Sequence, residues 1–387
     1  MATEWKKVKL GDIATFSNGI NFGKESYKAG VKLIGVSNFG NRFFPDYDEL
    51  EEVDENVLRP NDYLKNGDIV FVRSNGNKEL VGRCMLIQNP PSTVTYSGFC
   101  IRARLNNIDE NCPRFFAYYF KSKDFRKAMS NTAVGANIQN LNQGLLSNHI
   151  FYLPPLETQQ KIAGILSAYD DLIENNRKQI KHLEEAAQKL YKEWFVKLNF
   201  PGHENVKIVD GVPEGWKKEK VGNIIKTLPK TKQVKTAETL SNGEIPVIDQ
   251  SRDFIAGYTN DKETIIKSET PVIVFGDHTR ILKLIQFPFA RGADGTQVFI
   301  SINNCIKEYQ LYCALVEIDL SNYSYARHFK YLKEQEILIP TKELSEVFEV
   351  FVKSNYQLIQ KLRNKIQLLQ FARDKLLPKL MNGGLEV

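Results

Sequence analysis

The sequence predicts a mixed α/β protein in which two similar globular segments are each followed by a long helix. It repeats itself, because EWKKVKLGDIAT beginning at Glu4 resembles GWKKEKVGNIIK beginning at Gly215. The two copies also close alike, since HIFYLPPLETQQ with Pro154 and QEILIPTKELSE with Pro340 each lead into a long helical pattern. Strand-like runs bounded by turn residues fill both copies. The chain is therefore expected to fold as two related halves, a pseudo-twofold internal repeat.

The two closing helices carry the sharpest pattern. From Ile162 to Trp194, apolar residues are spaced alternately by four and three positions, and a shift by the separation of Pro154 and Pro340 places a second such row from Phe348 to Leu380. This heptad spacing predicts a coiled-coil seam. One amphipathic stripe would fit a helix lying on an ordinary core, but two stripes in register favour pairing of the helices within the chain. The predicted seam residues are Ile162, Leu166, Ile173, Ile180, Leu183, Leu190, Ile359, Leu362, Ile366, Leu369 and Leu376.

Three polar residues interrupt this seam: Asn176, Asn355 and Arg373. Buried polar residues in a coiled coil can set its register at a cost in stability. For Arg373 we expect a position near water at a loose end of the pair, because a long basic side chain reaches solvent from such a place.

The segments before each helix read as mixed strands and helices. Apolar runs bounded by Gly, Asn, Asp or Pro predict strands within 31–39, 67–74, 97–105, 245–251, 270–277 and 296–301, and helices are predicted at 113–129 and 308–318. Residues 199–214 have Pro and Gly at both ends and no helical period, which is typical of a linker. The chain thus divides into a globular domain at 1–153, a long helix at 154–198, the linker at 199–214, a second domain at 215–339 and a second long helix at 340–387.

Composition narrows the class of protein only moderately. The 387 residues carry a formal charge of +6, which mildly favours a polyanionic partner. The five cysteines form no CxxC pair, so neither a disulfide framework nor a zinc site is indicated. The start of the sequence lacks a signal-peptide pattern, and no apolar run is long enough to cross a bilayer. A reducing cytoplasm is the expected location.

Catalytic motifs are nearly matched at two places. NPPST beginning at Asn89 is similar to a base-holding loop of amino-methyltransferases, but Ser92 replaces the stacking aromatic, so a turn is predicted. GINFGKES beginning at Gly19 falls one residue short of the phosphate-binding loop spacing and is predicted to be an ordinary loop. The five histidines show no metal-binding spacing, and no catalytic triad is evident. No catalytic residue and no metal site is therefore predicted.

Four stretches together resemble the specificity subunit of Type I restriction-modification systems, and the resemblance covers nearly the whole chain. They are WKKVKLGDIA from Trp5, GDIVFVRSNGNKELVG from Gly67, NIQNLNQGLLSNHIFYLPPLETQQKIAGIL from Asn137, and RNKIQLLQFARDKLLPKLMNG from Arg363. The second copy departs from this pattern, with Thr341, Lys342 and Ser345 in place of Pro155, Leu156 and Gln159.

The resemblance implies two target-recognition domains that each read one half of a bipartite DNA site. It also implies that the long helices are antiparallel, hold the two domains apart and dock two methyltransferase subunits. A helix of roughly 40 residues spans about 60 Å, which exceeds one turn of DNA and suits two separated half-sites. By the same resemblance, this chain is not an enzyme and carries no cofactor: S-adenosylmethionine, ATP and Mg belong to the methyltransferase and restriction (nuclease-translocase) subunits.

Candidate DNA contacts are polar residues on loops that follow apolar strands, because Arg suits guanine while Asn and Gln suit adenine. By the resemblance, loops at these places lie along the DNA, although a polar loop is often only a solvated turn. The main candidates are Arg73, Ser74, Asn75, Asn77 and Lys78 in the first copy, and Asp277, His278, Thr279 and Arg280 in the second. The secondary candidates are Ser37, Asn38, Arg42, Asn137, Gln139, Asn140, Gln250, Arg252, Arg291, Asp294, Gln297, Tyr325, Arg327, His328 and Lys330.

Two other functions compete with DNA recognition. A self-contained modification or restriction enzyme is disfavoured by the lack of cofactor and nuclease motifs. A coiled-coil scaffold that binds proteins would explain the helices but leaves the paired polar loops without a role.

Overall fold

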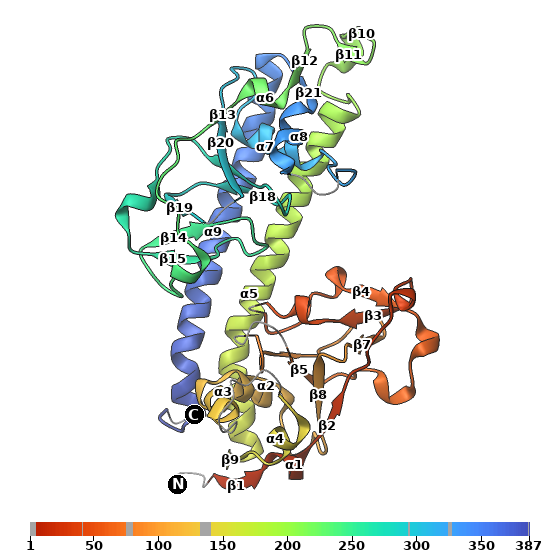
Figure 1. The fold of residues 1–387 in the computed structure, drawn as a ribbon, viewed down its shortest axis with the longest axis vertical. Helices are drawn as coiled ribbons and strands as arrows, with labels where there is room; N and C mark the ends of the chain where they lie inside the picture. The colour runs from red at the N-terminus through yellow and green to blue at the C-terminus, as the bar shows by residue number, and fades with distance from the viewer. Residues whose placement is uncertain are drawn as a thin grey trace. The chain divides into compact units, whose positions relative to one another are not determined.

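The protein is described here by a computed structural model that covers residues 5–40, 42–74, 80–131, 141–292, 295–323, 327–385 and 387. The chain forms two compact units: unit 1 comprises residues 1–175 and 366–387, and unit 2 comprises residues 176–365. The long helices α5 (Leu156–Tyr191) and α9 (Lys342–Met381) each contribute one half to either unit (Figure 1). Each unit therefore groups a globular domain with two helix halves, whereas the division made from the sequence set the helices apart.

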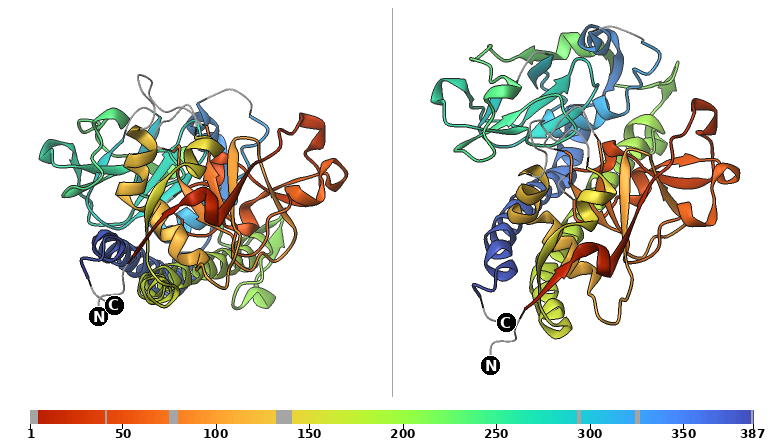
Figure 2. Two further views of the ribbon diagram at one scale, coloured as in Figure 1. Left: turned by 90° about the horizontal axis from the view of Figure 1, so that it is seen from below. Right: turned by 60° about the horizontal axis from the view of Figure 1, so that its bottom comes forward.

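Unit 1 contains the strands β1 (Lys6–Lys9), β2 (Ala14–Asn18), β3 (Val31–Ile34), β4 (Glu51–Val53), β5 (Ile69–Val72), β6 (Cys84–Leu86), β7 (Val94–Tyr96), β8 (Cys100–Leu105) and β9 (Ile150–Leu153). They form an antiparallel sheet of order β2-β8-β5-β6, a sheet of order β4-β3-β7 with β3 parallel to β7, and the pair β1-β9. Strand β5 reads IVFV and is buried throughout, as unbroken apolar runs are in strands covered on both faces. The β4-β3-β7 sheet lies on the side of unit 1 away from α5 (Figures 1 and 2).

The shorter helices of unit 1 are α1 (Leu10–Ile13), α2 (Pro113–Lys121), α3 (Lys123–Asn131) and α4 (Gln143–Ser147). The helix predicted at 113–129 is broken at Ser122, because the Ser122 hydroxyl accepts the Phe125 N–H at 3.2 Å and begins α3 as a cap. Helix α2 starts with Pro113, which fits the first helical position. Its aromatic face, including Phe116 and Phe120, packs in one core with the sheet and with Leu166 of α5.

Unit 2 contains the strands β10 (Ile208–Val209), β11 (Val212–Pro213), β12 (Lys217–Lys220), β13 (Ile225–Thr227), β14 (Ile245–Ile248), β15 (Gly257–Thr259), β16 (Ile265–Ile266), β17 (Val272–Gly276), β18 (Leu282–Ile285), β19 (Phe289–Arg291), β20 (Thr296–Ser301) and β21 (Glu336–Ile339), and the helices α6 (Val221–Ile224), α7 (Glu308–Val316) and α8 (His328–Glu334). Sheet β13-β20-β17-β18 corresponds to β2-β8-β5-β6 of unit 1, and the pair β12-β21 corresponds to β1-β9. Strands β14 and β19 run parallel, as β3 and β7 do. Within the predicted linker, β10 and β11 form a small hairpin.

The repeat extends to single backbone contacts. The Leu10 N–H donates to His149 O at 2.8 Å, and in unit 2 the Val221 N–H donates to Gln335 O at 2.9 Å. The residue after each of these donors is glycine. A Cβ on Gly11 would lie 2.9 Å from Ser147 O, and a Cβ on Gly222 would lie 3.1 Å from Lys333 O. The same close approach of two segments thus requires glycine in both copies, and the predicted duplication is confirmed.

The long helices contact each other in both units, through Glu184 and Arg363 in unit 2 and through Asp170 and Arg373 in unit 1. Every seam residue predicted from the spacing is buried or half-buried. In unit 2, Glu184 of α5 pairs with Arg363 of α9 at 2.8 Å, whereas Tyr191 further along α5 packs against Phe348 near the start of α9. Partners later in α5 thus meet residues earlier in α9, so the helices are antiparallel.

Each long helix also has a second buried face, which the heptad spacing does not indicate. In unit 1, Ala163, Ser167 and Asp170 of α5 are buried although none belongs to the seam. In unit 2, Ser345 and Tyr356 of α9 are buried in the same way. These residues face the globular domains, since Ser345 donates a hydrogen bond to Gln310 Oε1 of α7 and the Tyr356 hydroxyl contacts Cys313 Sγ at 3.4 Å. The helices therefore bury their apolar surface against the globular cores as well as against each other.

The start of each long helix is tied to its globular domain by a buried polar side chain. In unit 1, Gln159 accepts the Cys112 N–H at 2.9 Å and donates to Pro154 O at 2.9 Å. In unit 2, Ser345 stands at this position and reaches Gln310 instead. The second copy thus lacks the glutamine that ties the helix start to its domain in the first copy. A polar residue of α7 makes the corresponding contact.

The expected position of Arg373 near water is wrong. Its side chain is buried, with 8% of the residue exposed, and its guanidinium forms ion pairs with Asp170 and Asp374. The carboxylate of Asp170 is itself buried and also accepts the Tyr118 hydroxyl of α2 at 2.6 Å. Burial, and then the Asp170 carboxylate, raise the pKa of Tyr118 well above its usual range. A buried carboxylate needs a cation beside it, which explains why arginine occupies the seam here.

We predict that Asp170→Ala lowers the free energy of unfolding by about 3–5 kcal/mol, because it removes the buried partner of the buried Arg373 and leaves only the exposed Asp374. The matched control is Asp374→Ala, which removes the other partner of Arg373. The Asp374 side chain is 58% exposed, so its loss costs less than about 1 kcal/mol. Urea unfolding of the three proteins measures the difference, and equal costs for the two variants would contradict the assignment.

A second prediction concerns Glu349 of α9, whose carboxylate accepts the Gln310 N–H at 3.2 Å. Burial raises the pKa of Glu349 from 4.5 to about 7. The folded state therefore holds a proton that the unfolded chain releases above pH 4.5, and the free energy of unfolding falls as pH rises from 4.5 through 7. Glu349→Gln removes this loss and stabilises the protein by up to about 3 kcal/mol at pH 8, with little effect at pH 4.5. Thermal melts across this pH range, with exposed Glu346→Gln as control, test it; parallel curves for wild type and Glu349→Gln would refute it.

Candidate nucleic-acid interface

The two main candidate loops occupy equivalent places in the two units. After β5, the Arg73 N–H donates to Phe99 O at 2.7 Å; after β17, the Asp277 N–H donates to Gly295 O at 2.7 Å. In unit 1 the acceptor immediately precedes β8, which pairs with β5. In unit 2 the acceptor immediately precedes β20, which pairs with β17. The two loops therefore begin with the same backbone contact in both units.

The candidates of unit 1 differ in how free their side chains are. Arg73 and Ser74 are half-buried, and Ser37 is exposed. The side chain of Asn38 accepts the Gly35 N–H at 2.7 Å, and Arg42 forms an ion pair with Asp46 at 2.6 Å. The candidates that lie outside the described residues are Asn75, Asn77, Lys78, Asn137, Gln139 and Asn140.

In unit 2 the structure brings several candidates together around Gln250. Its side-chain oxygen accepts the His278 N–H at 3.1 Å, and its carbonyl accepts the Thr279 hydroxyl at 2.7 Å. Gly295 completes this cluster with a φ of +84°, and a Cβ there would lie 2.7 Å from His278 Cδ2. Residues from three separate stretches of sequence thus form one polar edge, in which only glycine fits the close approach.

The remaining exposed candidates of unit 2 are mainly basic. Arg280 is exposed, has a φ of +62° and donates to Leu320 O at 3.0 Å, so its side chain is partly anchored. Arg252, Arg327 and Lys330 are exposed, and Gln297 is half-buried on β20. Asp294 and Tyr325 lie outside the described residues.

Three candidates are buried and have structural roles. Asp277 accepts the Phe329 N–H at 2.8 Å through its side chain and the His328 N–H at 3.0 Å through its carbonyl, so it holds the start of α8. The ring of His328 in turn lies 2.9 Å from Asp277 O and 3.0 Å from Tyr323 O. Arg291 is buried on β19. These side chains shape the edge and are not carried into the proposed interface.

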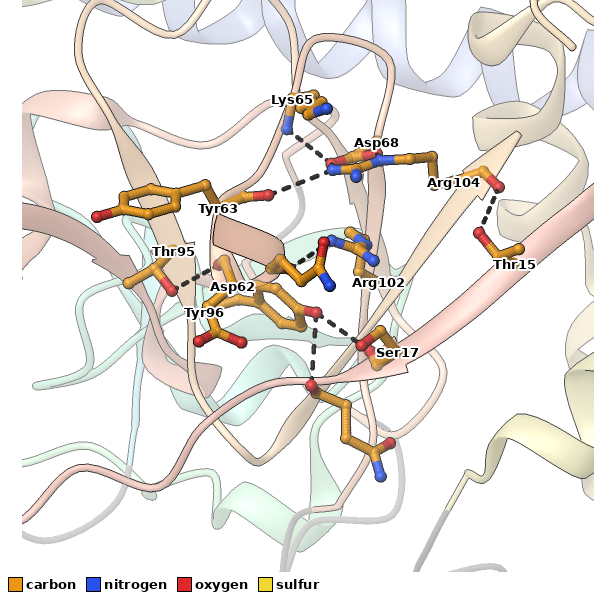
Figure 3. A network of polar contacts seen from close by, with 12 residues as sticks. Thr15, Ser17, Asp62, Tyr63, Lys65, Asp68, Thr95, Tyr96, Arg102 and Arg104 are labelled. Atoms are coloured by element: carbon orange, nitrogen blue, oxygen red, sulfur yellow. Dashed lines mark hydrogen bonds and ion pairs between the residues drawn. The ribbon is translucent and has the colours of Figure 1, made fainter. Parts of the chain in front are cut away.

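Two arginines of β8 in unit 1 belong to a polar network inside the domain (Figure 3). Arg104 binds both carboxylate oxygens of Asp68, at 2.6 and 2.7 Å, and Asp68 is only 1% exposed. This paired contact raises the pKa of Arg104 and fixes the geometry of both groups. Arg102 donates to Asn61 O at 2.8 Å. Both guanidinium groups therefore join β8 to the segment before β5.

A surface depression beside Arg73 was not foreseen from the sequence. Its volume is about 510 Å³, and it is lined by Ile20, Asn21, Phe22, Tyr27, Arg73, Ser74, Ser97, Gly98 and Phe99. The stretch GINFGKES forms part of its wall, and this stretch is a loop, as predicted. The DNA contacts predicted from the sequence are all polar residues, so they do not include Phe99. Its place next to Arg73 follows when the loops of the two units are aligned.

Other kinds of site were sought in the same residues. Within the described part of the chain, no three His, Cys, Asp or Glu side chains gather as metal ligands would. The five cysteines are free, and burial raises the pKa of Cys100 and Cys313 to about 12. In the described ranges no helix combines the length and apolar character needed to span a membrane.

The fold thus contains two copies of one α/β domain, each with a polar loop edge at the same place and each packed on the antiparallel long helices. Residues 2–185 match the model of the Type I restriction modification DNA specificity domain. The chain is 28% identical over 300 residues to the Type I restriction enzyme MjaIX specificity subunit of Methanocaldococcus jannaschii, which covers 70% of this chain and 69% of that protein. Residues 2–185 therefore belong to the family of Type I restriction modification DNA specificity domains, and the chain is similar to Type I restriction enzyme specificity subunits over a longer stretch.

Further relatives agree with this membership. The chain is 27% identical over 164 residues to the Type I restriction enzyme EcoKI specificity subunit of Escherichia coli, an alignment that spans 41% of this chain and about a third (34%) of that protein. Its fold is similar to the crystal structure of the S subunit of a Type I restriction-modification system from M. genitalium, with a TM-score of 0.52 at 18% identity. That similarity covers 98% of this chain and 96% of the other, so the fold is shared over nearly the full length.

Proposed function

We propose that this chain reads a bipartite DNA site for a Type I restriction-modification complex, with one half-site bound by each unit, and performs no chemistry itself. The observation that carries the proposal is the pair of equivalent edges after β5 and β17, which have the same backbone hydrogen bonds but different side chains. One scaffold thus presents two different sets of polar groups. Two such sets suit two unlike half-sites better than a single uniform target.

Specific reading is assigned to a few side chains on these edges. Arg73 in unit 1 and Arg280 in unit 2 are suited to the paired acceptors of guanine, and Gln297 is suited to adenine. The exposed Arg252, Arg327 and Lys330 are suited to phosphates, which position a protein on DNA without specifying sequence. The formal charge of +6 fits such contacts.

Docking of methyltransferase subunits is assigned to the outer faces of the long helices. In unit 2, Val350 is 73% exposed and lies beside exposed Phe351 on α9; in unit 1, Leu368 and Phe371 of α9 are also exposed. Large apolar residues clustered on a helix face mark an interaction surface more often than a solvated one. Because each unit has its own exposed group, we assign one methyltransferase subunit to each.

Chemistry is assigned to the partner subunits. The methyltransferase subunits would bind S-adenosylmethionine and extrude the target base, and the restriction subunits would use ATP and Mg. The role of this chain is to choose the DNA at which those reactions occur.

The direct test is to map methylated bases in the host genome with and without this chain, and to co-purify the chain with the methyltransferase subunit encoded beside it. We expect methylation at one bipartite motif to disappear when the chain is deleted and to return when it is restored. Unchanged methylation together with no co-purified methyltransferase would reject the proposal in favour of a protein-binding scaffold. Methyl transfer by the purified chain alone would reject the non-catalytic assignment.

A substitution test assigns each unit to its half-site. Arg73→Ala should weaken binding to the cognate duplex by about 5- to 150-fold and should relax base preference in one half-site only, while Arg280→Ala should do so in the other. The control is Arg59→Ala, which removes an exposed arginine outside the loops. Competition binding against duplexes scrambled in one half-site at a time gives the readout. Base readout by these arginines would be refuted if both variants lost affinity equally for every duplex.

A further inference from the structure

The strongest unassigned feature of the molecule is the depression of unit 1 beside Arg73. We infer that it receives one nucleobase of the half-site bound by unit 1, after that base has left the stack of the duplex. The inference rests on the proposed function and adds a binding site for an extrahelical base on this chain.

Two stretches of chain that line the depression, 20–22 and 97–99, approach each other closely. A Cβ on Gly98 would lie 2.1 Å from Asn21 Oδ1, and a Cβ on Gly19 would lie 2.2 Å from Ser97 O, so neither glycine could carry a side chain without a shift. The Gly98 N–H donates to Ile20 O at 2.6 Å and holds the two segments together. Glycine at positions 19 and 98 thus permits the close approach of the two stretches that line the depression.

The walls of the depression are aromatic and unusually open. Phe99 is 57% exposed and Tyr27 is 47% exposed, and the half-buried Phe22 also belongs to the lining. Across the described ranges, neither Phe99 nor Tyr27 stacks on another aromatic ring of the protein. Their faces are therefore available to a ring from outside, and nucleobases stack on such side chains whatever their sequence.

The lining of the depression is also partly polar. Arg73, Ser74 and Asn21 supply hydrogen-bonding groups there, and within the described part of the chain the Arg73 guanidinium forms no ion pair. A ligand that suits this site is flat, has apolar faces and has hydrogen-bonding atoms along an edge. A nucleobase meets all three requirements, and its phosphate backbone would be attracted by the nearby guanidinium.

The site is confined to one unit. Phe99 and Gly295 are equivalent, because their carbonyls accept the N–H of the equivalent residues Arg73 and Asp277. The glycine of unit 2 brings no ring, and a Cβ at that place would meet the side chains of His278 and Gln250. The second half-site therefore serves as an internal control.

The experiment scans single mismatches through both half-sites of the cognate duplex and measures affinity for the complex of this chain with its methyltransferase subunits. A protein that extrudes a base binds more tightly when that base is already unpaired. The methylated bases, known from the methylation map, are left out because their extrusion is assigned to the methyltransferase. The variants are Phe99→Ala, Phe99→Trp, which keeps an aromatic face, and Ile108→Ala, which removes an exposed apolar residue beyond the other end of β8.

We expect one mismatch position in the half-site of unit 1 to strengthen binding by about 5- to 100-fold, and none in the half-site of unit 2. Phe99→Ala should abolish this gain, whereas Phe99→Trp and Ile108→Ala should retain it. A gain that survives Phe99→Ala, no gain anywhere, or an equal loss of affinity for every duplex would overturn the inference while leaving the proposed function standing. Failure of the wild type to distinguish cognate from scrambled DNA would overturn both.

Discussion

The second buried face of each long helix is the contact on which both units depend. In unit 1 the Tyr118 hydroxyl of α2 reaches Asp170 of α5, and in unit 2 Cys313 of α7 meets the Tyr356 hydroxyl of α9. Asp170 and Tyr356 occupy equivalent places in the two repeats, so the tyrosine comes from the globular domain in one unit and from the long helix in the other. Because this contact joins each domain to a helix that is itself paired in the seam, the orientation of each loop edge within its unit follows from the helix packing.

The two loop edges share their backbone hydrogen bonds but differ in their side chains. The hydrogen bonds that position Arg73 and Asp277 use only main-chain atoms, so they do not restrict which side chains stand there. One edge therefore presents an arginine next to an open aromatic ring, whereas the other presents a buried aspartate next to a glycine. A scaffold of this kind can change its target by substitution at a few positions without a change of fold, which suits a subunit whose role is to define sequence specificity.

Periodicity and repetition in the sequence predicted the duplication, the main strands and the seam of both helices. It did not predict the burial of Arg373, because a heptad pattern reports one face of a helix, whereas the second face is built from small and polar residues such as Ser167 and Asp170. A polar residue after a strand reads as an exposed loop, so the cap that Asp277 forms on α8, far away in sequence, was not foreseen. Phe99 is not among the predicted DNA contacts, because only polar side chains form hydrogen bonds with base edges.

The central claim is that two units of one chain hold two separate stretches of DNA. Hydroxyl-radical footprinting of the complex of this chain with its methyltransferase subunits, on DNA that carries the mapped motif, tests this most directly. Two protected stretches, one over each half of the motif, with accessible sugars between them are predicted. A single protected stretch confined to one half, or protection that does not depend on the motif, would contradict the account.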